Sequence, residues 1–202
     1  MIELKNICKS YGERKIFDNF SATINSGEFV IFSGESGSGK TTLLNIIGGL
    51  EDIDSGAVIV DGTDISKTRN KIRYFQDKVG FLFQNFGLVD SKSVAQNLDI
   101  VKITDKTQSI TSVLDAVGLS GYEKRKVYSL SGGEQQRVAL ARLMLKKCSI
   151  ILADEPTGSL DSNNAEKVIE ILKKLNEQGK TIIMVTHDQK FRDMGMRVIE
   201  IK

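Results

Sequence analysis

The chain of 202 residues predicts an α/β fold with a mostly parallel core sheet, an N-terminal antiparallel β subdomain and an inserted α-helical subdomain. Residues 1–24 alternate imperfectly between apolar and polar side chains, which is typical of half-buried antiparallel strands. Residues 93–125 contain helical segments and no convincing strand. Elsewhere, short apolar runs that suit buried parallel strands recur between helical patterns, at residues 29–32, 79–83, 150–153 and 181–185.

The length and composition limit the domain organisation and the partners. We expect one domain over 1–202, with a core formed by 1–92 and 126–202 and a helical insertion at about 93–125. Twenty-eight basic and 26 acidic residues leave a net charge of +2, so nothing indicates a nucleic-acid partner. The two cysteines are too few for a disulfide framework or a zinc site, which fits a reducing compartment.

The sequence has no signal-peptide pattern at its start and no apolar run that approaches the length of a transmembrane helix. We therefore expect a soluble, cytoplasmic chain. If it acts at a membrane, another chain must supply the membrane-spanning part.

The early elements follow from the spacing of apolar residues. Strands are expected at 2–7 and 16–24, and a turn at 25–27 leads into the buried strand 29–32. A short strand at 57–60 and a charged helix at 67–75 follow. Between the strands 29–32 and 57–60, Gly48-Gly49 ends a helix whose predicted apolar face consists of Leu43, Leu44, Ile47 and Leu50.

A glycine-rich loop joins the strand 29–32 to that helix. It fits the pattern G-x-x-x-x-G-K-[ST] and consists of Gly34, Glu35, Ser36, Gly37, Ser38, Gly39, Lys40 and Thr41. The glycines let backbone N–H groups point inward, and the helix that follows adds the positive end of its dipole, so the loop favours a phosphate. Lys40 then reaches the outer phosphates, and Thr41 offers its hydroxyl to Mg²⁺. A flexible Gly/Ser loop is the alternative, but the flanking strand and helix favour nucleotide binding.

One aromatic residue and one polar residue lie at the ends of predicted strands, and the role of each can be interpreted in two ways. Tyr11, at the end of the first strand stretch, is either a packed aromatic or a ring that stacks on a nucleobase. Gln84 directly follows the strand 79–83 and is either a loop glutamine or a ligand. The helical segments of the insertion are expected at 93–101 and 109–117.

The stretch 130–134, Leu-Ser-Gly-Gly-Glu, opens the next helix. Ser131 and Glu134 form an S-x-x-E capping box, which is its structural explanation. The capping box leaves Gly132 and Gly133 unexplained, because glycine is a poor helix former. Without side chains they would let a phosphate approach the amides, which makes this a candidate second anion-binding helix end.

A buried strand at 150–154 ends in two adjacent carboxylates, Asp154 and Glu155, at the sheet edge where ligands of parallel sheets collect. Asp154 can hold Mg²⁺ directly or through water. Glu155, expected to point the other way on the strand, can orient and deprotonate a water for attack on the terminal phosphoryl group. Surface carboxylates are common after strands, so this interpretation depends on the phosphate loop.

The last third repeats the strand–helix pattern. Ser159, Leu160 and Asp161 lead into a helix with Val168, Ile169, Leu172 and Leu175 on one face, ended by Gly179. The strand 181–185 is followed by His187, the only histidine of the chain. Because its strand ends beside those of the carboxylates and the loop, we favour contact with the terminal phosphate over a structural role. A last strand is expected at 197–201.

Taken together, these motifs resemble the ATP-binding subunit of ATP-binding cassette (ABC) transporters over essentially the whole chain. The loop 34–41 is similar to the Walker A motif of that family, residues 150–155 to Walker B, and residues 130–134 to the signature motif. Gln84 resembles the Q-loop residue and His187 the switch histidine. Ser159-Leu160-Asp161 resembles the D-loop, and Tyr11 the adenine-stacking aromatic.

The resemblance implies a P-loop NTPase that uses ATP and Mg²⁺, and it assigns roles to residues. The catalytic residues implied are Glu155, His187, Gln84 and Lys40, and the Mg²⁺ ligands are Thr41, Gln84 and Asp154. ATP contacts are implied for Tyr11, Gly34, Glu35, Ser36, Gly37, Ser38, Gly39, Lys40, Thr41, Thr42 and Asp161, and in trans for Ser131, Gly132 and Gly133.

The resemblance also implies partners. ATP closes a head-to-tail homodimer, in which the signature residues of one copy complete the site of the other. A separate transmembrane permease holds the chain at the inner face of the plasma membrane, and motion passes to it through the groove near Gln84 and the insertion.

The stretches 83–88 and 153–161 are most similar to the branch that contains macrolide exporters, lipoprotein-releasing ATPases and the cell-division ATPase, and 88–94 to bacteriocin-export ATPases. The resemblance therefore implies an ATPase that powers export of a peptide, antimicrobial or drug. The alternative is a regulatory ATPase that transmits force to a membrane complex without transport. Soluble cassettes of DNA repair or translation would need long coiled coils or tandem cassettes, and the sequence contains neither.

Overall fold

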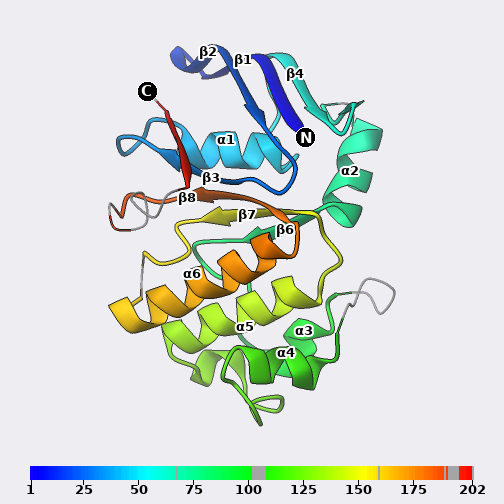
Figure 1. Cartoon of the computed structure of the whole chain (residues 1–202), viewed down its shortest axis with the longest axis vertical. Coiled ribbons are helices and arrows are strands. Elements are labelled where there is room, and N and C mark those ends of the chain that lie inside the picture. Colours follow the sequence, from blue (N-terminus) through cyan, green and yellow to red (C-terminus); the bar gives the residue numbers. More distant parts are fainter. Residues whose placement is uncertain (67, 102–107, 159, 189, 191–195, 202) are drawn as a thin grey trace.

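The structure is a computed structural model, and it describes residues 1–66, 68–101, 108–158, 160–188, 190 and 196–201. Two sheets and their helices are stacked in layers (Figure 1). The antiparallel sheet lies at one end, helix α1 (Lys40–Ile47) lies beneath it, the parallel sheet crosses the middle, and helices α5 (Gly132–Leu145) and α6 (Ser162–Glu177) cover the other face of the parallel sheet. The predicted α/β fold with two sheets and a helical insertion is therefore confirmed.

The core sheet is parallel throughout, in the order β6-β7-β8-β3-β9. Its central strands are apolar runs because helices cover both faces. The strands are β3 (Phe29–Ser33), β6 (Val79–Leu82), β7 (Ile150–Asp154), β8 (Thr181–Val185) and β9 (Arg197–Glu200).

The antiparallel sheet has the order β2-β1-β4-β5. It consists of β1 (Ile2–Tyr11), β2 (Arg14–Ile24), β4 (Ser55–Val60) and β5 (Thr63–Asp64). β1 and β2 together are longer than the predicted stretches, and they reach Tyr11 opposite Arg14 at the hairpin tip. The two-residue β5 was not predicted, because two residues carry no periodicity.

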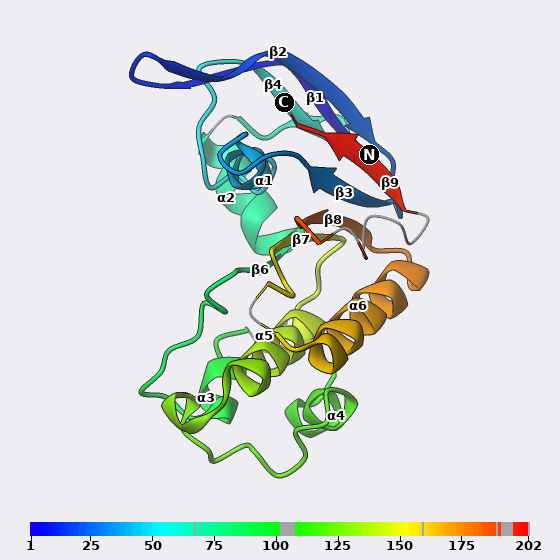
Figure 2. The same cartoon turned by 90° about the vertical axis from the view of Figure 1, so that its left-hand side faces the viewer.

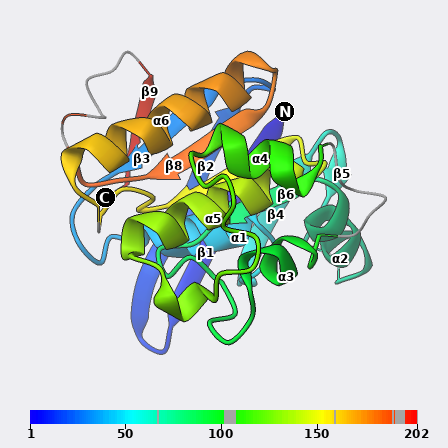
Figure 3. The ribbon, with the colours of Figure 1, turned by 90° about the horizontal axis from the view of Figure 1, so that it is seen from below.

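The helices are α1 (Lys40–Ile47), α2 (Thr68–Asp77), α3 (Val94–Leu98), α4 (Ile110–Ala116), α5 (Gly132–Leu145) and α6 (Ser162–Glu177), with a 3₁₀ turn at Val127–Ser129. Helices α3 and α4 belong to the predicted insertion, and Figure 3 shows α4 and α5 close together on the underside with α6 beyond them. No helix among the described residues is long and apolar enough to cross a membrane.

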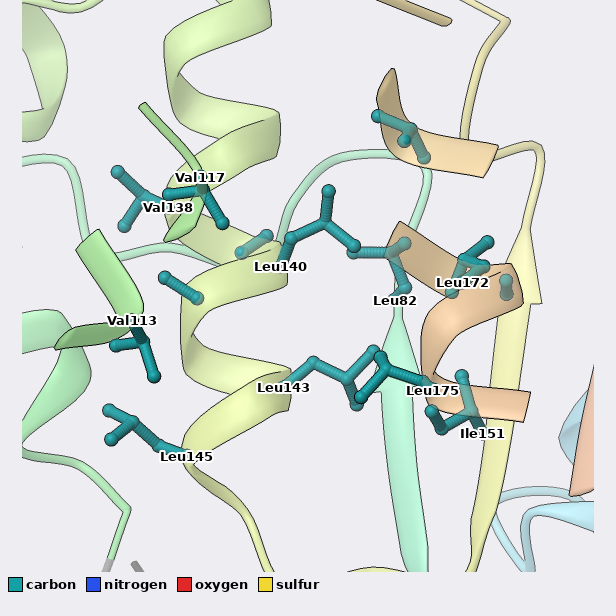
Figure 4. Close-up of a cluster of buried hydrophobic side chains, with 14 of the residues drawn as sticks. Leu82, Val113, Val117, Val138, Leu140, Leu143, Leu145, Ile151, Leu172 and Leu175 are labelled. Carbon is teal, nitrogen blue, oxygen red and sulfur yellow. The ribbon is translucent and has the colours of Figure 1, made fainter. Parts of the chain in front are cut away.

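Alternate residues of the core strands pack into two separate apolar cores, because successive side chains of a strand point to opposite faces of the sheet. On β7, Ile151 and Ala153 face the core beneath α5 and α6, whereas Ile150 and Leu152 face α1 and the antiparallel sheet. Figure 4 shows the first of these cores, where Leu140 and Leu143 of α5 point toward the sheet and α6. The core strands are thereby packed on both faces up to their carboxyl ends.

Two sequence predictions about these elements were wrong. Leu50 does not extend the apolar face of α1, because α1 ends at Ile47 and the side chain of Leu50 is 47% exposed. Glu155 does not continue β7: the strand ends at Asp154, and Glu155 has a left-handed φ of 45°. That turn, rather than strand alternation, sets the direction of its side chain.

Candidate nucleotide-binding site

The loop between β3 and α1 has a conformation that only glycine accommodates at two points. Gly39 precedes the first turn of α1 with φ of 94°, and a Cβ there would lie 2.5 Å from Cγ2 of Ile16. Gly34 has φ of 151°, and its Cβ would lie 2.1 Å from the carbonyl oxygen of Ile201. No side chain in the described part of the chain caps α1, so its first N–H groups remain available to an anion.

Lys40 lies folded over this loop. Its ammonium donates to the carbonyl oxygens of Gly34, at 2.9 Å, and Glu35, at 2.6 Å. The hydroxyl of Ser38 is buried without a hydrogen-bond partner among the described residues. A buried unpaired hydroxyl is costly, and a phosphate oxygen is a group that would satisfy it. The loop therefore fits the triphosphate of a nucleotide.

The ends of α1 and β7 meet at the side chains of Thr41 and Asp154. The hydroxyl of Thr41 donates to Oδ1 of Asp154 at 3.1 Å. Burial raises the pKa of Asp154, and the hydrogen bond from Thr41 acts in the opposite direction. Hydroxyl and carboxylate oxygens suit Mg²⁺, which is commonly held by one or two carboxylates together with substrate phosphates. Within the described ranges no cluster of three His, Cys, Asp or Glu side chains could hold a metal alone, so this pair fits a metal shared with phosphate.

Glu155 and His187 form a pair beside Asp154. The backbone N–H of Glu155 donates to the carbonyl oxygen of Val185, and Oε1 lies 2.9 Å from Nδ1 of His187. Oε2 is buried without a hydrogen-bond partner in the described part of the chain. The imidazole is 73% exposed, and its hydrogen bond to Glu155 raises the pKa of His187. One carboxylate oxygen is thus held while the other lacks a partner.

Two adjoining cavities lie at this edge and share Glu155. The first, of about 360 Å³, contains predicted site residues and three additional ones; it is lined by Tyr11, Ser36, Gly37, Gly39, Lys40, Thr41, Thr42 and Glu155, with Arg14, Ile16 and Val185. The second, of about 390 Å³, is lined by Glu155, Thr157, Gly158, Leu160, Thr186, His187 and Asp188. Tyr11 is 48% exposed, which leaves area for a stacked base and argues against a packed core aromatic.

Gln84 and the Walker B carboxylates follow neighbouring strands. β6 pairs with β7 up to Leu82 opposite Ala153, so Gln84 and Asp154 lie beyond that pair at the same end of the sheet. Gln84 is exposed. In the described part of the chain, Gln84 does not line either of the two cavities. Its proposed part in catalysis and metal binding therefore rests on its position at this edge of the sheet.

The stretch 130–134 caps α5 as the sequence predicted. The hydroxyl of Ser131 accepts from the N–H of Glu134, and the Glu134 carboxylate accepts from the N–H of Ser131. A Cβ on Gly132 would meet no atom within 4 Å among the described residues, and on Gly133 its nearest neighbour would be Nδ2 of Asn164 at 3.4 Å. Crowding within one chain therefore does not require these glycines. In the described structure neither they nor Ser131 line the two cavities.

Asp161 caps α6 and is linked to α5 by residues that the sequence analysis missed. Its carboxylate accepts from the N–H of Asn164 at 3.0 Å, and Oδ1 of Asn164 accepts from Arg137 at 2.7 Å. Gln136, also on α5, donates to the carbonyl oxygen of Pro156 at 2.8 Å. No signal in the sequence marks these pairs, because they depend on how α5 packs beside α6 and the loop after β7.

The predicted D-loop is only partly visible in this geometry. Leu160 and Asp161 have the positions given above, whereas Ser159 lies outside the described residues.

A strand, a glycine-rich loop and a helix, with a carboxylate at the end of another strand of the same sheet bonded to the first turn of that helix, define the class of P-loop nucleotide-binding proteins. More specifically, the chain belongs to the ABC transporter family, whose family model matches residues 17–158. It is an ATP-binding cassette ATPase, as the sequence motifs predicted.

The most informative relatives differ in length. Over its whole length the chain is 45% identical to the macrolide export ATP-binding/permease protein MacB of Campylobacter jejuni subsp. jejuni serotype O:2, and 39% identical to MacB of Escherichia coli. It spans only 33% of either protein. It is also 41% identical to the ABC transporter ATP-binding protein MJ0796 of Methanocaldococcus jannaschii, and it spans 93% of that protein.

Solved structures of MJ0796 have the same fold. A dimeric structure of this cassette matches the whole chain with a TM-score of 0.90 at 39% identity, and the match covers 94% of that chain. A second dimeric structure, of a post-hydrolysis state bound to ADP and Pi, matches with a TM-score of 0.89 at 38% identity and the same coverage. The names of the macrolide export relatives agree with the predicted branch.

Proposed function

We propose that the chain is the ATP-binding and hydrolysing subunit of an exporter that moves a peptide, antimicrobial or drug through a separate membrane permease. The observation that carries this is the place of Glu155, whose side chain lines both cavities beside the phosphate loop and His187. The relatives named for macrolide export support an export function. The match to the ABC transporter ATP-binding protein MJ0796, of which the chain spans 93%, supports the ATP-binding role.

In the proposed site ATP lies along the first cavity. The adenine stacks on Tyr11, and the phosphates bind the loop amides and Lys40, which exchanges its carbonyl partners for phosphate oxygens. Thr41, Asp154 and Gln84 would hold Mg²⁺, and the ion would supply positive charge that neutralises the phosphates.

Glu155 acts as the general base in this proposal. Its unpaired Oε2 orients a water molecule and takes its proton while the water oxygen bonds to the terminal phosphorus. The bond from that phosphorus to the bridging oxygen breaks, and ADP and phosphate leave. His187 keeps the carboxylate oriented through Oε1 and contacts the terminal phosphate.

The site is completed by a second copy of the chain. The terminal phosphate of the partner's ATP is bound by Ser131, Gly132 and Gly133. Asp161 lies at the interface between the two copies. The open space around Gly132 supports this, because a Cβ there would clash with nothing in its own chain as described. The dimeric state of both MJ0796 structures supports it as well.

A groove on the insertion side is the proposed contact for the permease. It has a volume of about 410 Å³ and is lined chiefly by aromatic and apolar side chains, among them Phe75, Phe81, Phe83 and Ile100, with Arg142 at its wall. Arg142 donates to the carbonyl oxygens of Phe86 and Gly87, so the groove is tied to the segment after Gln84. Docking there places the chain at the inner, cytoplasmic face of the plasma membrane.

Reconstitution with the co-purified permease tests export. In inverted membrane vesicles, ATP should drive uptake of a labelled macrolide or peptide by the wild type, and the Glu155→Gln variant should give none. ATP turnover without movement of any labelled compound would contradict export and favour the regulatory, force-transmitting alternative.

A further inference from the structure

The hairpin that carries Tyr11 is only two-stranded at its tip. β1 pairs with β4 up to Cys8 opposite Ser55, but with β2 up to Tyr11 opposite Arg14. The ladder is also irregular, with register shifts on either side of Lys9. Figure 2 shows the tip extending beyond the rest of the antiparallel sheet. Because a two-stranded ribbon is marginally stable alone, the position of the ring depends on side-chain contacts.

These contacts come from two cations. On the core side, Nζ of Lys9 lies 2.5 Å from a Glu51 carboxylate oxygen and 4.8 Å from the centre of the Tyr11 ring. On the nucleotide side, Nη2 of Arg14 donates to the carbonyl oxygen of Gly37, in the middle of the phosphate loop, at 2.9 Å. Arg14 thus bonds the ring-bearing hairpin directly to the loop that binds phosphate.

The surroundings of Arg14 belong to the nucleotide site. It lines the same cavity of about 360 Å³ as Tyr11 and Lys40. Further along β2, Ile16 and Phe17 approach Gly39 so closely that a Cβ there would lie 2.5 and 2.9 Å from their side chains. Packing therefore fixes the base of the hairpin against the end of the loop, and beyond it Arg14 is the residue that bonds to the loop.

We propose that Arg14 is a positioning residue that fixes Tyr11 relative to the phosphate loop, so that base and phosphate recognition act together. This rests on the proposed stacking of adenine on Tyr11. A ring held at a fixed distance from the loop can bind the base without first being ordered, whereas a loose hairpin must be ordered by the nucleotide. Removal of Arg14 therefore weakens the contribution of the base to ATP binding and leaves the contribution of the phosphates unchanged.

Calorimetric titration of the full chain with ATP and with inorganic tripolyphosphate separates these contributions. We expect Arg14→Ala to weaken ATP binding about threefold to tenfold, the range that follows from the net worth of one hydrogen bond. Binding of tripolyphosphate should change less than twofold. In a Tyr11→Ala background, Arg14→Ala should have little further effect on ATP binding. Partial unfolding would weaken the binding of ATP and of tripolyphosphate alike. The ratio of the two affinities therefore reports the positioning of Tyr11.

Lys15→Ala is the matched control. Lys15 neighbours Arg14 on β2 and carries the same charge, but it pairs with the exposed Asp18 and does not line the cavity in the described structure. The proposal is overturned if Arg14→Ala binds both ligands as Lys15→Ala does, or if it weakens the binding of ATP and tripolyphosphate equally. It is also overturned if Arg14→Ala still weakens ATP binding in the absence of the Tyr11 ring. Wild-type chain that binds neither ligand would instead contradict the nucleotide site itself.

Discussion

Glu155 is held by one carboxylate oxygen and the backbone, and this arrangement is what a general base requires. Its turn conformation at φ of 45° aims the side chain along the edge of the sheet, and the hydrogen bond to His187 fixes one oxygen. A buried oxygen without a partner has an unmet capacity to accept a hydrogen bond. A water molecule placed between this oxygen and the terminal phosphate would meet it.

The pair predicts an abnormal titration of His187. Its hydrogen bond to Glu155 raises the pKa, Asp188 adds to the rise, and Lys40 opposes it. The charged pair is therefore fully formed below about pH 6.5, the ordinary histidine value, and is lost as the pH rises through the higher folded-state pKa. Because the ring is 73% exposed, the effect on folding stability is small.

The single histidine makes this measurable by proton NMR of the imidazole. In the nucleotide-free chain the pKa of His187 should lie above about 6.5. Glu155→Gln should lower it toward that value, and Lys15→Gln, which removes a cation that pairs with the exposed Asp18 instead, should leave it unchanged. An identical pKa in the wild type and in Glu155→Gln would show that the pair does not exist in solution.

Lys40 is predicted to contribute to binding rather than to stability. Its ammonium donates to two loop carbonyls, and phosphate oxygens would replace these as stronger, charge-assisted partners. Lys40→Ala should weaken ATP binding by about tenfold to 100-fold, given about 1.5–3 kcal/mol for hydrogen bonds to charged groups. Calorimetry on the purified chain measures this. Affinity equal to that of the wild type would remove Lys40 from the site.

At this scale the sequence predicts which residue types gather at the strand ends, and it misses side-chain contacts that depend on the local shape of a hairpin or loop. Thr41 and Asp154, 113 positions apart, meet as the parallel-sheet rule predicts. The bond from Arg14 to Gly37 was not predicted, because it depends on the curvature of a hairpin. The prediction that Glu155 lies on the strand was wrong, because alternation was extended one residue beyond the end of β7.

Among the elements, the N-terminus of α5 contains residues that cap the helix and glycines that the cap does not explain. Ser131 and Glu134 form the hydrogen bonds of the cap, and the buried face of α5 fixes the orientation of the helix. Two glycines at the start of a helix cost stability relative to alanine, by up to about 1 kcal/mol each. Since the surrounding chain leaves space for a Cβ at Gly132, we attribute this glycine to contact with another molecule.

Gly132→Ala tests this element. Thermal unfolding should show equal or slightly higher stability than the wild type, because alanine is the better helix former and meets no atom within 4 Å in the described structure. ATP-dependent dimer formation should fall, since a methyl group keeps the amides away from the partner's phosphate.

Gly48→Ala is the contrasting variant. Its Cβ would lie 2.3 Å from the ring of Phe81, so it should destabilise the fold by about 1–3 kcal/mol through overpacking. If Gly132→Ala destabilised the chain as much, or dimerised like the wild type, the glycine would have only a role within the single chain.

The order of elements follows from the sequence, but their neighbours do not. Apolar runs mark the strands of the core sheet, yet β9, the last along the chain, lies beside β3, an early strand. Which strand pairs with which depends on crossover geometry and on the two cores, and no local pattern records it. The antiparallel subdomain was predictable because its alternation reflects one buried face.

At the scale of the whole molecule, the proposed nucleotide site is divided between two separate surfaces of the chain. The phosphate loop, Glu155 and His187 lie at the carboxyl edge of the core sheet, and the glycines of α5 do not line those cavities in the described structure. α5 is nevertheless linked to the loop after β7 through Gln136 and Pro156. A movement of α5 on closing against a second copy would therefore reach the loop that holds Glu155.

The central claim is that ATP closes a dimer, which hydrolysis then opens. Light scattering on a sizing column with ATP and Mg²⁺ tests it most directly, using Glu155→Gln, whose amide cannot take a proton. We predict retained ATP binding, hydrolysis reduced about 100-fold or more, and a stable dimer that dissociates without nucleotide. A variant that stays monomeric with ATP and hydrolyses it at the wild-type rate would contradict the account.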